Sequence, residues 1–172
     1  MLLRCVSIVA LCLSIKTLAV ADTRLGGGIG DFRSQWGPPF HEEVLVRTAT
    51  LKWNEPRVGG RPIAPSIFAV EVAFLDRHAC EIVLRSRKKI SRDSLYRLVN
   101  PFVKSFKGTN MPKPKSDFPN STVYELSDHT VVLVNKFRGE SDVIVIMGAC
   151  YSQDQKIFDR EAAKVRPPTP NH

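Results

Sequence analysis

The sequence predicts an α+β fold in which helices pack on an antiparallel sheet of about six strands. Several short segments alternate apolar and polar residues, which is the period of a half-buried strand, and most are joined by short turns. Other segments repeat apolar residues at helical spacing. Strands joined by short turns outnumber the helices, so we expect two three-stranded antiparallel meanders backed by helices.

The first 21 residues have the pattern of a secretory signal peptide. A basic start precedes an apolar stretch over residues 5–15 and an Ala-Val-Ala exit at residues 19–21. The stretch is well short of the about 20 residues that a bilayer-spanning helix needs. We therefore expect a mature chain that begins at Asp22, is periplasmic or secreted, and contains no transmembrane segment.

The remaining chain has the length of one domain with one core. Residues 22–165 form this predicted domain, and the proline-rich residues 166–172 are expected to be a disordered tail. The full chain carries a formal net charge of +8, and only two of its basic residues lie in the signal peptide. The mature chain is therefore basic, which permits an anionic partner.

The first meander is predicted from three segments. Residues 43–53 alternate over eleven positions and predict one long strand ending in Trp53. Residues 54–65 are rich in proline and glycine and predict a loop. Residues 67–75 and 80–87 predict two further strands joined by a turn at residues 76–78.

The second meander is predicted over residues 122–126, 130–137 and 143–150. The last of these segments contains the run Val-Ile-Val-Ile-Met without polar alternation. Such a run is typical of a central strand that is covered on both faces.

Helices are predicted before each meander and after the second. A short helix over residues 31–36 must stop at the Gly-Pro-Pro of residues 37–39. Ser91 caps the next helix, in which Pro101 marks a kink or the start of a second short helix. Ser152 and Gln155 form a capping box that opens a helix through Val165, with Ile157, Phe158, Ala162 and Val165 available to pack. The glycine-rich residues 25–30 follow no strand and are expected to be a flexible leader.

Residues 30–87 resemble a layout common in small exported bacterial proteins. The residues that carry the resemblance are Trp36-Gly37-Pro38-Pro39, a strand ending in Trp53, and the strand Val70-Glu71-Val72-Ala73-Phe74-Leu75 that turns into Cys80-Glu81-Ile82-Val83. This layout is similar to the SmpA/BamE and β-lactamase-inhibitor-like modules. The resemblance implies helices on one face of an antiparallel sheet and a role in binding other proteins. The chain lacks the lipidated cysteine of the SmpA/BamE lipoproteins, so the resemblance transfers no functional residue.

Cys80 and Cys150 are the two cysteines of the mature chain, because Cys5 and Cys12 lie in the signal peptide. In an oxidising compartment they are expected to form one disulfide. An alternative is a catalytic or redox-active thiol, since Cys150 precedes a predicted helix start, which favours a thiolate. His78 or His129 would then act as base and Asp128 would orient it.

No cofactor is predicted. The histidines and cysteines have no recognised metal-ligand spacing, so no metal site is expected. Asn120 begins an N-glycosylation sequon, which is relevant only in a eukaryotic source.

The densest basic run contains Arg85, Arg87, Lys88, Lys89 and Arg92. It is interpreted either as a solvated turn or as a surface for an anion or partner. Interleaved aromatic residues are lacking and the chain is expected to be exported, so nucleic acid is not an expected partner. The expected partner is an acidic protein or an anionic component of the cell envelope.

Together these observations predict an exported binding or structural protein rather than an enzyme. The rival hypothesis is a small cysteine-dependent hydrolase or thiol redox protein that uses Cys150. The sequence names neither the ligand nor the oligomeric state.

Overall fold

The structure is a computed structural model that describes residues 22–58, 60–104, 106, 109–136 and 142–148. The described helices are α1 (Ile29–Trp36), α2 (Arg92–Val99) and the 3-10 helix η1 (Asn100–Phe102). The described strands are β1 (His41–Val44), β2 (Thr48–Asn54), β3 (Arg57–Val58), β4 (Arg61–Pro62), β5 (Ile67–Leu75), β6 (His78–Ser86), β7 (Ser116–Phe118), β8 (Ser121–Glu125), β9 (Val131–Lys136) and β10 (Asp142–Met147).

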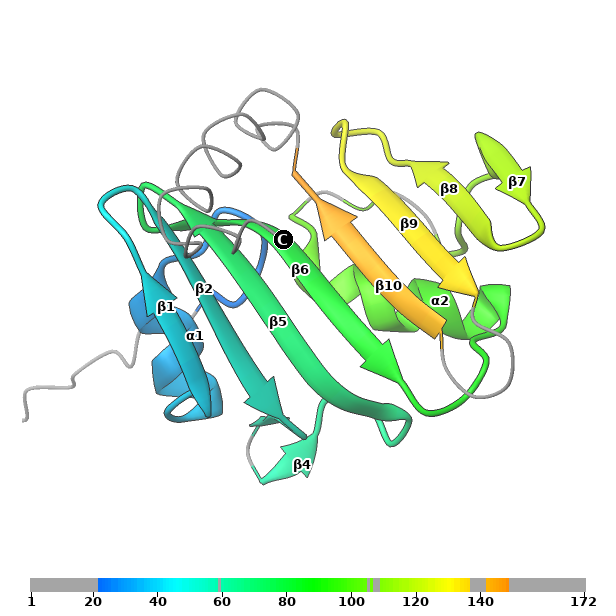
Figure 1. Cartoon of the computed structure of the whole chain (residues 1–172). Helices are drawn as coiled ribbons and strands as arrows, with labels where there is room; N and C mark the ends of the chain where they lie inside the picture. Colours follow the sequence, from blue (N-terminus) through cyan, green and yellow to red (C-terminus); the bar gives the residue numbers. More distant parts are fainter. Residues whose placement is uncertain (1–21, 59, 105, 107–108, 137–141, 149–172) are drawn as a thin grey trace, which may run out of the picture.

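Eight strands form one open antiparallel sheet in the order β1-β2-β5-β6-β10-β9-β8-β7 (Figure 1). The α+β class and the antiparallel sheet are confirmed. The predicted number of about six strands in two three-stranded meanders is wrong, because each meander has a fourth, outer strand. β3 and β4 form a separate two-stranded hairpin within the predicted loop.

The fourth strand of the first meander comes from dividing the predicted strand over residues 43–53. The chain turns after Val44, and the Leu45 N–H donates to the carbonyl of Thr48 at 2.8 Å. Val46 lies at the tip of this hairpin and is 98% exposed. The turn residues 45–47 include no glycine, proline, asparagine or aspartate, so the sequence contains no turn signal there. The fourth strand of the second meander is β7, a three-residue edge strand that pairs with β8 and lies in a segment for which the sequence predicts no strand.

Each half of the chain is a helix followed by four strands of the large sheet. The halves join where β6 pairs with β10, with Val83 opposite Val145. β10 therefore lies in the middle of the sheet, as predicted. Its Ile144 and Ile146 are buried, whereas Val145 and Met147 on the other face are half-buried.

The helices begin and end at residues suited to these positions. The Gly28 N–H donates to the Asp31 carboxylate at 3.0 Å at the start of α1, and Gly37 caps its C-terminal end. Ser91 caps α2 by accepting from the N–H of Ser94, as predicted. Pro101 lies in the first turn of η1, where it replaces an N–H that would have no helical partner.

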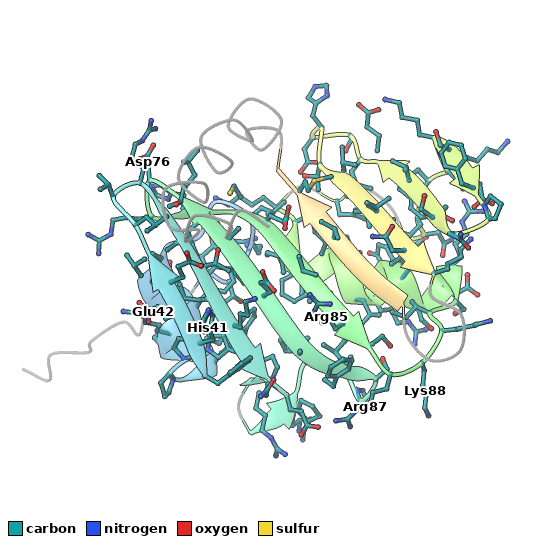
Figure 2. The ribbon with its side chains drawn as sticks, in the orientation of Figure 1. His41, Glu42, Asp76, Arg85, Arg87 and Lys88 are labelled. Atoms are coloured by element: carbon teal, nitrogen blue, oxygen red, sulfur yellow. The ribbon has the colours of Figure 1, made fainter. Side chains whose placement is uncertain are left out.

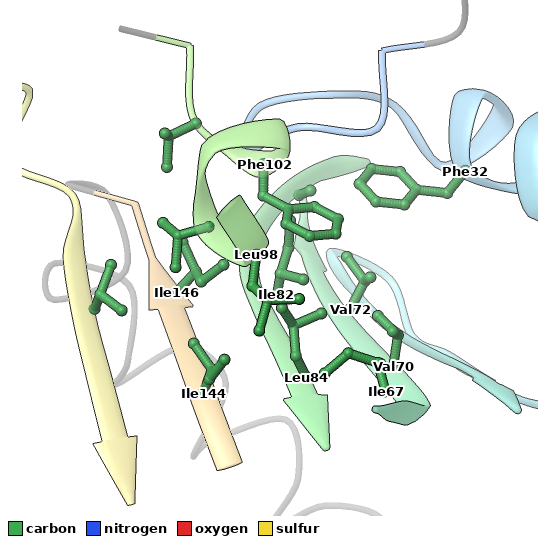
Figure 3. Close-up of a cluster of buried hydrophobic side chains, with 14 of the residues drawn as sticks. Phe32, Ile67, Val70, Val72, Ile82, Leu84, Leu98, Phe102, Ile144 and Ile146 are labelled. Carbon is green, nitrogen blue, oxygen red and sulfur yellow. The ribbon is translucent and has the colours of Figure 1, made fainter. Parts of the chain in front are cut away.

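Both helices pack on the same face of the sheet and enclose one core (Figure 3). Phe32 from α1 contacts Phe74 and Trp36, with ring centroids 5.3 and 5.0 Å apart. The largest fully buried side chains include Phe32, Leu51, Val70, Val72, Phe74, Ile82, Leu84, Val99, Val132, Ile144 and Ile146. The packing of α1 and α2 on one side leaves the opposite face of the sheet without a described helix.

The glycine-rich segment before α1 is not a flexible leader. The Gly26 N–H donates to the carbonyl of Ala79 at 2.7 Å, and the Ala79 N–H donates to that of Gly27 at 2.9 Å. A Cβ at Gly27 would lie 1.9 Å from the backbone oxygen of Asp22. The glycines therefore permit close backbone packing beside β6, which corrects the expectation.

Four of the predicted features lie outside the described residues: the signal peptide over residues 1–21, Cys150, the helix over residues 152–165 and the tail over residues 166–172. No helix within the described ranges is long and apolar enough to cross a membrane.

Candidate functional site

Two loops rich in cationic residues meet at one end of the sheet. The first, residues 55–66, joins β2 to β5, and the second, residues 87–91, joins β6 to α2. The Arg87 N–H donates to the carbonyl of Ser66 at 2.8 Å, and its guanidinium pairs with Glu55 at 2.9 Å. We call this region, with its cations Arg57, Arg61, Arg87, Lys88 and Lys89, the basic end (Figure 2).

Two of the five predicted anion-binding residues point away from the basic end. Arg85 lies on the sheet face opposite the helices, with its Nη2 atom 3.8 Å from the Glu71 carboxylate. Arg92 donates to the backbone oxygens of Met111 and Pro112 at 3.1 and 2.8 Å. Arg92 therefore holds the segment after η1 against α2, which is a structural role.

The other three predicted residues form one side of the basic end. Arg87 lies over the ring of Phe68, 5.5 Å from its centroid, in addition to its pairing with Glu55. The side chains of Lys88 and Lys89 are exposed and have no hydrogen bond or ion pair within the described part of the chain. These two ammonium groups are the cations of the predicted run that are available to a partner.

Ser86 positions the backbone from which the lysines project. Its hydroxyl is buried, donates to the carbonyl of Lys88 at 2.7 Å and accepts from the N–H of the same residue at 3.1 Å. The turn is thus closed by a side chain that belongs to β6.

Sequence reasoning missed Arg57 and Arg61, which are exposed residues of the β3–β4 hairpin. Arg57 donates to the carbonyl of Gly60 at 3.4 Å. A sequence signal that could have found them is that they and Glu55 are the only charged residues of the loop over residues 55–66. What could not be read from the sequence is that this loop and residues 87–91 lie at the same end.

The basic end can attract and hold anions. Like charges on adjacent loops add their potentials, which speeds the capture of an oppositely charged partner. All five cations are exposed, so each contact is worth only about 0.2–1 kcal/mol and is weakened by salt. Affinity must therefore come from several contacts at once.

The opposite end of β6 borders a pocket of about 390 Å³. It is lined by Leu25, Gly26, Leu75, Asp76, His78, Ala79, Cys80, Lys104, Asp128, Thr130 and Gly148. The structure thus brings together His78 and Asp128 of the rival catalytic hypothesis. His129 points elsewhere, because its side chain is 82% exposed and its Nδ1 atom lies 3.9 Å from Glu125.

The polar groups of this pocket have structural partners. His78 Nδ1 lies 3.1 Å from the Gly26 carbonyl oxygen, and the Asp128 carboxylate accepts from the Thr130 N–H at 3.1 Å. Hydrogen bonds from the Arg47 guanidinium hold the pKa of the Asp76 carboxyl below its ordinary value, so Asp76 is ionised at neutral pH.

Cys80 is buried beside this pocket, and its Sγ atom lies 3.3 Å from the carbonyl oxygen of Ala73. Its own carbonyl accepts from the N–H of Gly148 at 2.9 Å. Cys150 is two residues further along the chain and outside the described residues, so the disulfide stays a prediction. Among the described residues there is no cluster of three or more His, Cys, Asp and Glu side chains that could hold a metal ion.

Comparisons of the chain with protein-family models, curated proteins and solved structures found no match. The resemblance to SmpA/BamE and β-lactamase-inhibitor-like modules is therefore still a prediction from sequence.

Proposed function

We propose that the protein is an exported, non-catalytic binding protein that holds an anionic partner at the basic end. The observation that carries this proposal is that two cation-bearing loops meet at one end of the sheet through the contacts of Arg87 with Glu55 and Ser66. One loop carries Arg57 and Arg61, and the other carries Arg87, Lys88 and Lys89. An acidic protein surface or an anionic polymer of the cell envelope offers the multiple charges that such exposed cations need. The resemblance to exported protein-binding modules agrees with this role.

Charge substitution at the basic end tests the proposal. Arg87, Lys88 and Lys89 are changed together to Gln, and binding of fluorescent poly-glutamate is followed by anisotropy. The control is Arg77, Arg97 and Lys113 changed to Gln, which lowers the net charge equally at exposed positions elsewhere. We expect the first variant to bind about fivefold more weakly at low salt, because Lys88 and Lys89 each contribute about 0.5 kcal/mol. The control is expected to bind nearly as the natural chain does.

Ionic strength provides the second arm of this experiment. The difference between the two triple variants should shrink between about 0.01 M and 0.15 M salt, since the Debye length falls from about 30 to about 8 Å. Equal weakening of the two variants would show that net charge alone drives binding and would reject the basic end as the site.

Export is tested separately by N-terminal sequencing of protein recovered from the source cells. The Ala-Val-Ala exit predicts a mature N-terminus at or near Asp22 in the periplasmic or secreted fraction. A cytosolic species that keeps Met1 would contradict both the compartment and the oxidising surroundings assumed for the cysteines.

A second candidate function is thiol chemistry at Cys150. The observation that favours it is the pocket lined by His78, Asp128 and Gly148. Gly148 lies two residues before Cys150 in the chain. A catalytic thiolate would be alkylated by iodoacetamide well below pH 8, whereas an ordinary thiol has a pKa near 8.5. This candidate would be rejected if the unreduced protein is not alkylated, or if its alkylation depends on pH as that of an ordinary thiol does.

A further inference from the structure

The sheet face opposite α1 and α2, here called the open face, carries mostly apolar side chains around the half-buried Glu81 toward the end where β10 finishes. Its side chains are those that alternate with the core residues, and the pairing of β2, β5, β6, β10 and β9 places them in rows across the sheet. The apolar members of these rows are Ala73, Leu75, Val83, Val131, Leu133, Val145 and Met147.

Part of the open face is buried, although both described helices lie on the other side of the sheet (Figures 1 and 3). Val83 is 9% exposed and Thr48 is 6% exposed. The ionic side chains nearer the basic end are accessible, with Lys52 and Arg85 36% and 47% exposed. The buried side chains of the open face are thus confined to one half of it. A segment that covers this half would account for their burial.

The chain itself supplies a segment of suitable length and pattern. Gly148 follows the last residue of β10 at this same end, and residues 149–172 come after it. The helix predicted over residues 152–165 would be about 21 Å long, enough to cross about four strands. Its apolar residues, Ile157, Phe158, Ala162 and Val165, fall on one side of a helical projection, and Lys156 and Ala163 fall on the other.

We propose that residues 149–172 dock on the half of the open face around Thr48, Val83 and Met147, with the predicted helix placing Phe158 and Val165 against the sheet. Docking of the chain's own segment explains the burial of Val83 and removes an apolar surface that would otherwise promote association. It also leaves the basic end, at the other end of β6, accessible to a partner. The proposal does not depend on the nature of that partner.

Photo-crosslinking of the mature chain tests this docking. Phe158 is replaced by benzoyl-phenylalanine, which keeps an aromatic side chain, and the irradiated protein is digested and analysed by mass spectrometry. We expect a cross-link within one chain to residues 48–52, 69–86 or 142–148, with loss of the corresponding free peptide. The same probe at Lys156, on the opposite side of the predicted helix, is expected to leave these peptides unmodified.

Other cross-linking patterns would overturn the proposal. A cross-link between two chains would assign the open face to a second copy, and a cross-link to α1, α2 or no protein residue would place the segment elsewhere. Benzoyl-phenylalanine at Val165 is the second variant if the Phe158 replacement does not fold. Binding of poly-glutamate to the same protein distinguishes a failure of this proposal from a failure of the proposed anion site.

Discussion

Trp36 and Trp53 lie edge to face in the core, with ring centroids 5.2 Å apart. Their indole N–H groups differ in hydrogen bonding. Trp53 Nε1 donates to the carbonyl of Gly37 at 3.0 Å. Trp36 Nε1 is buried and has no acceptor among the described residues. Burying an N–H without an acceptor destabilises the fold, whereas a hydrogen-bonded N–H also satisfies the carbonyl that accepts from it.

Replacing each tryptophan by phenylalanine makes this difference measurable. Both changes remove ring volume, but Trp53→Phe also leaves the Gly37 carbonyl without its donor, while Trp36→Phe removes an unpaired N–H. We expect Trp53→Phe to lower the free energy of unfolding by about 1–2 kcal/mol more than Trp36→Phe does. Urea unfolding followed by circular dichroism gives both values, and equal losses would contradict the assignment of the hydrogen bonds.

β6 connects the two ends of the molecule that carry its candidate sites. It begins at the pocket beside Cys80 and ends at Ser86, whose buried hydroxyl closes the turn that carries Lys88 and Lys89. Its partners β5 and β10 hold it on both sides. The geometry of the basic end therefore depends on how this strand terminates.

Ser86→Ala tests that dependence. Loss of the hydroxyl leaves the backbone N–H and C=O of Lys88 without their partner, so we expect a loss of about 1–3 kcal/mol in unfolding free energy. Hydrogen exchange at the Lys88 amide should become faster. The control is Ser34→Ala, whose hydroxyl donates to the Asp31 carbonyl at an exposed position and whose removal should cost less than about 0.5 kcal/mol. Equal effects would show that the turn is held by other contacts.

At the scale of the whole molecule, the predicted disulfide would join Cys80 in the first half of the chain to Cys150 in the second. The Gly148 N–H bonds to the Cys80 carbonyl, and two residues of chain reach at most about 7 Å. A disulfide requires the two Cα atoms to be about 4.4–6.8 Å apart, so the predicted bond is within the reach of the chain. It would fix the start of residues 149–172 beside β6.

The disulfide predicts a specific result for the unreduced mature protein. No thiol should titrate in denaturant, and the intact mass should be lower than that of the reduced chain by two hydrogens. Cys150→Ala should lower the free energy of unfolding by about 2–5 kcal/mol. Titration of both thiols in the unreduced protein would contradict the disulfide and would direct attention to Cys150 as a reactive group.

Local sequence patterns determined the type and approximate position of most described elements. The strand Ile67–Leu75 lies at its predicted residues, and Ser91 begins α2 as its capping pattern indicated. Asp76 and Arg77 turn the chain between β5 and β6 with positive φ, as a two-residue hairpin requires. These features depend on neighbouring residues, so a sequence window contains the information.

Only the tertiary structure decided how distant segments meet. Sequence could not show that β6 pairs with β10, that Arg57 lies at the same end as Lys88, or that Arg85 and Arg92 are directed to Glu71 and to the backbone after η1. It also could not show that the residues after Val44 turn back to form a second strand, because residues 45–47 lack the residue types that mark turns. Pairing between segments far apart in the chain is selected by burial of the whole core, and no local pattern encodes it.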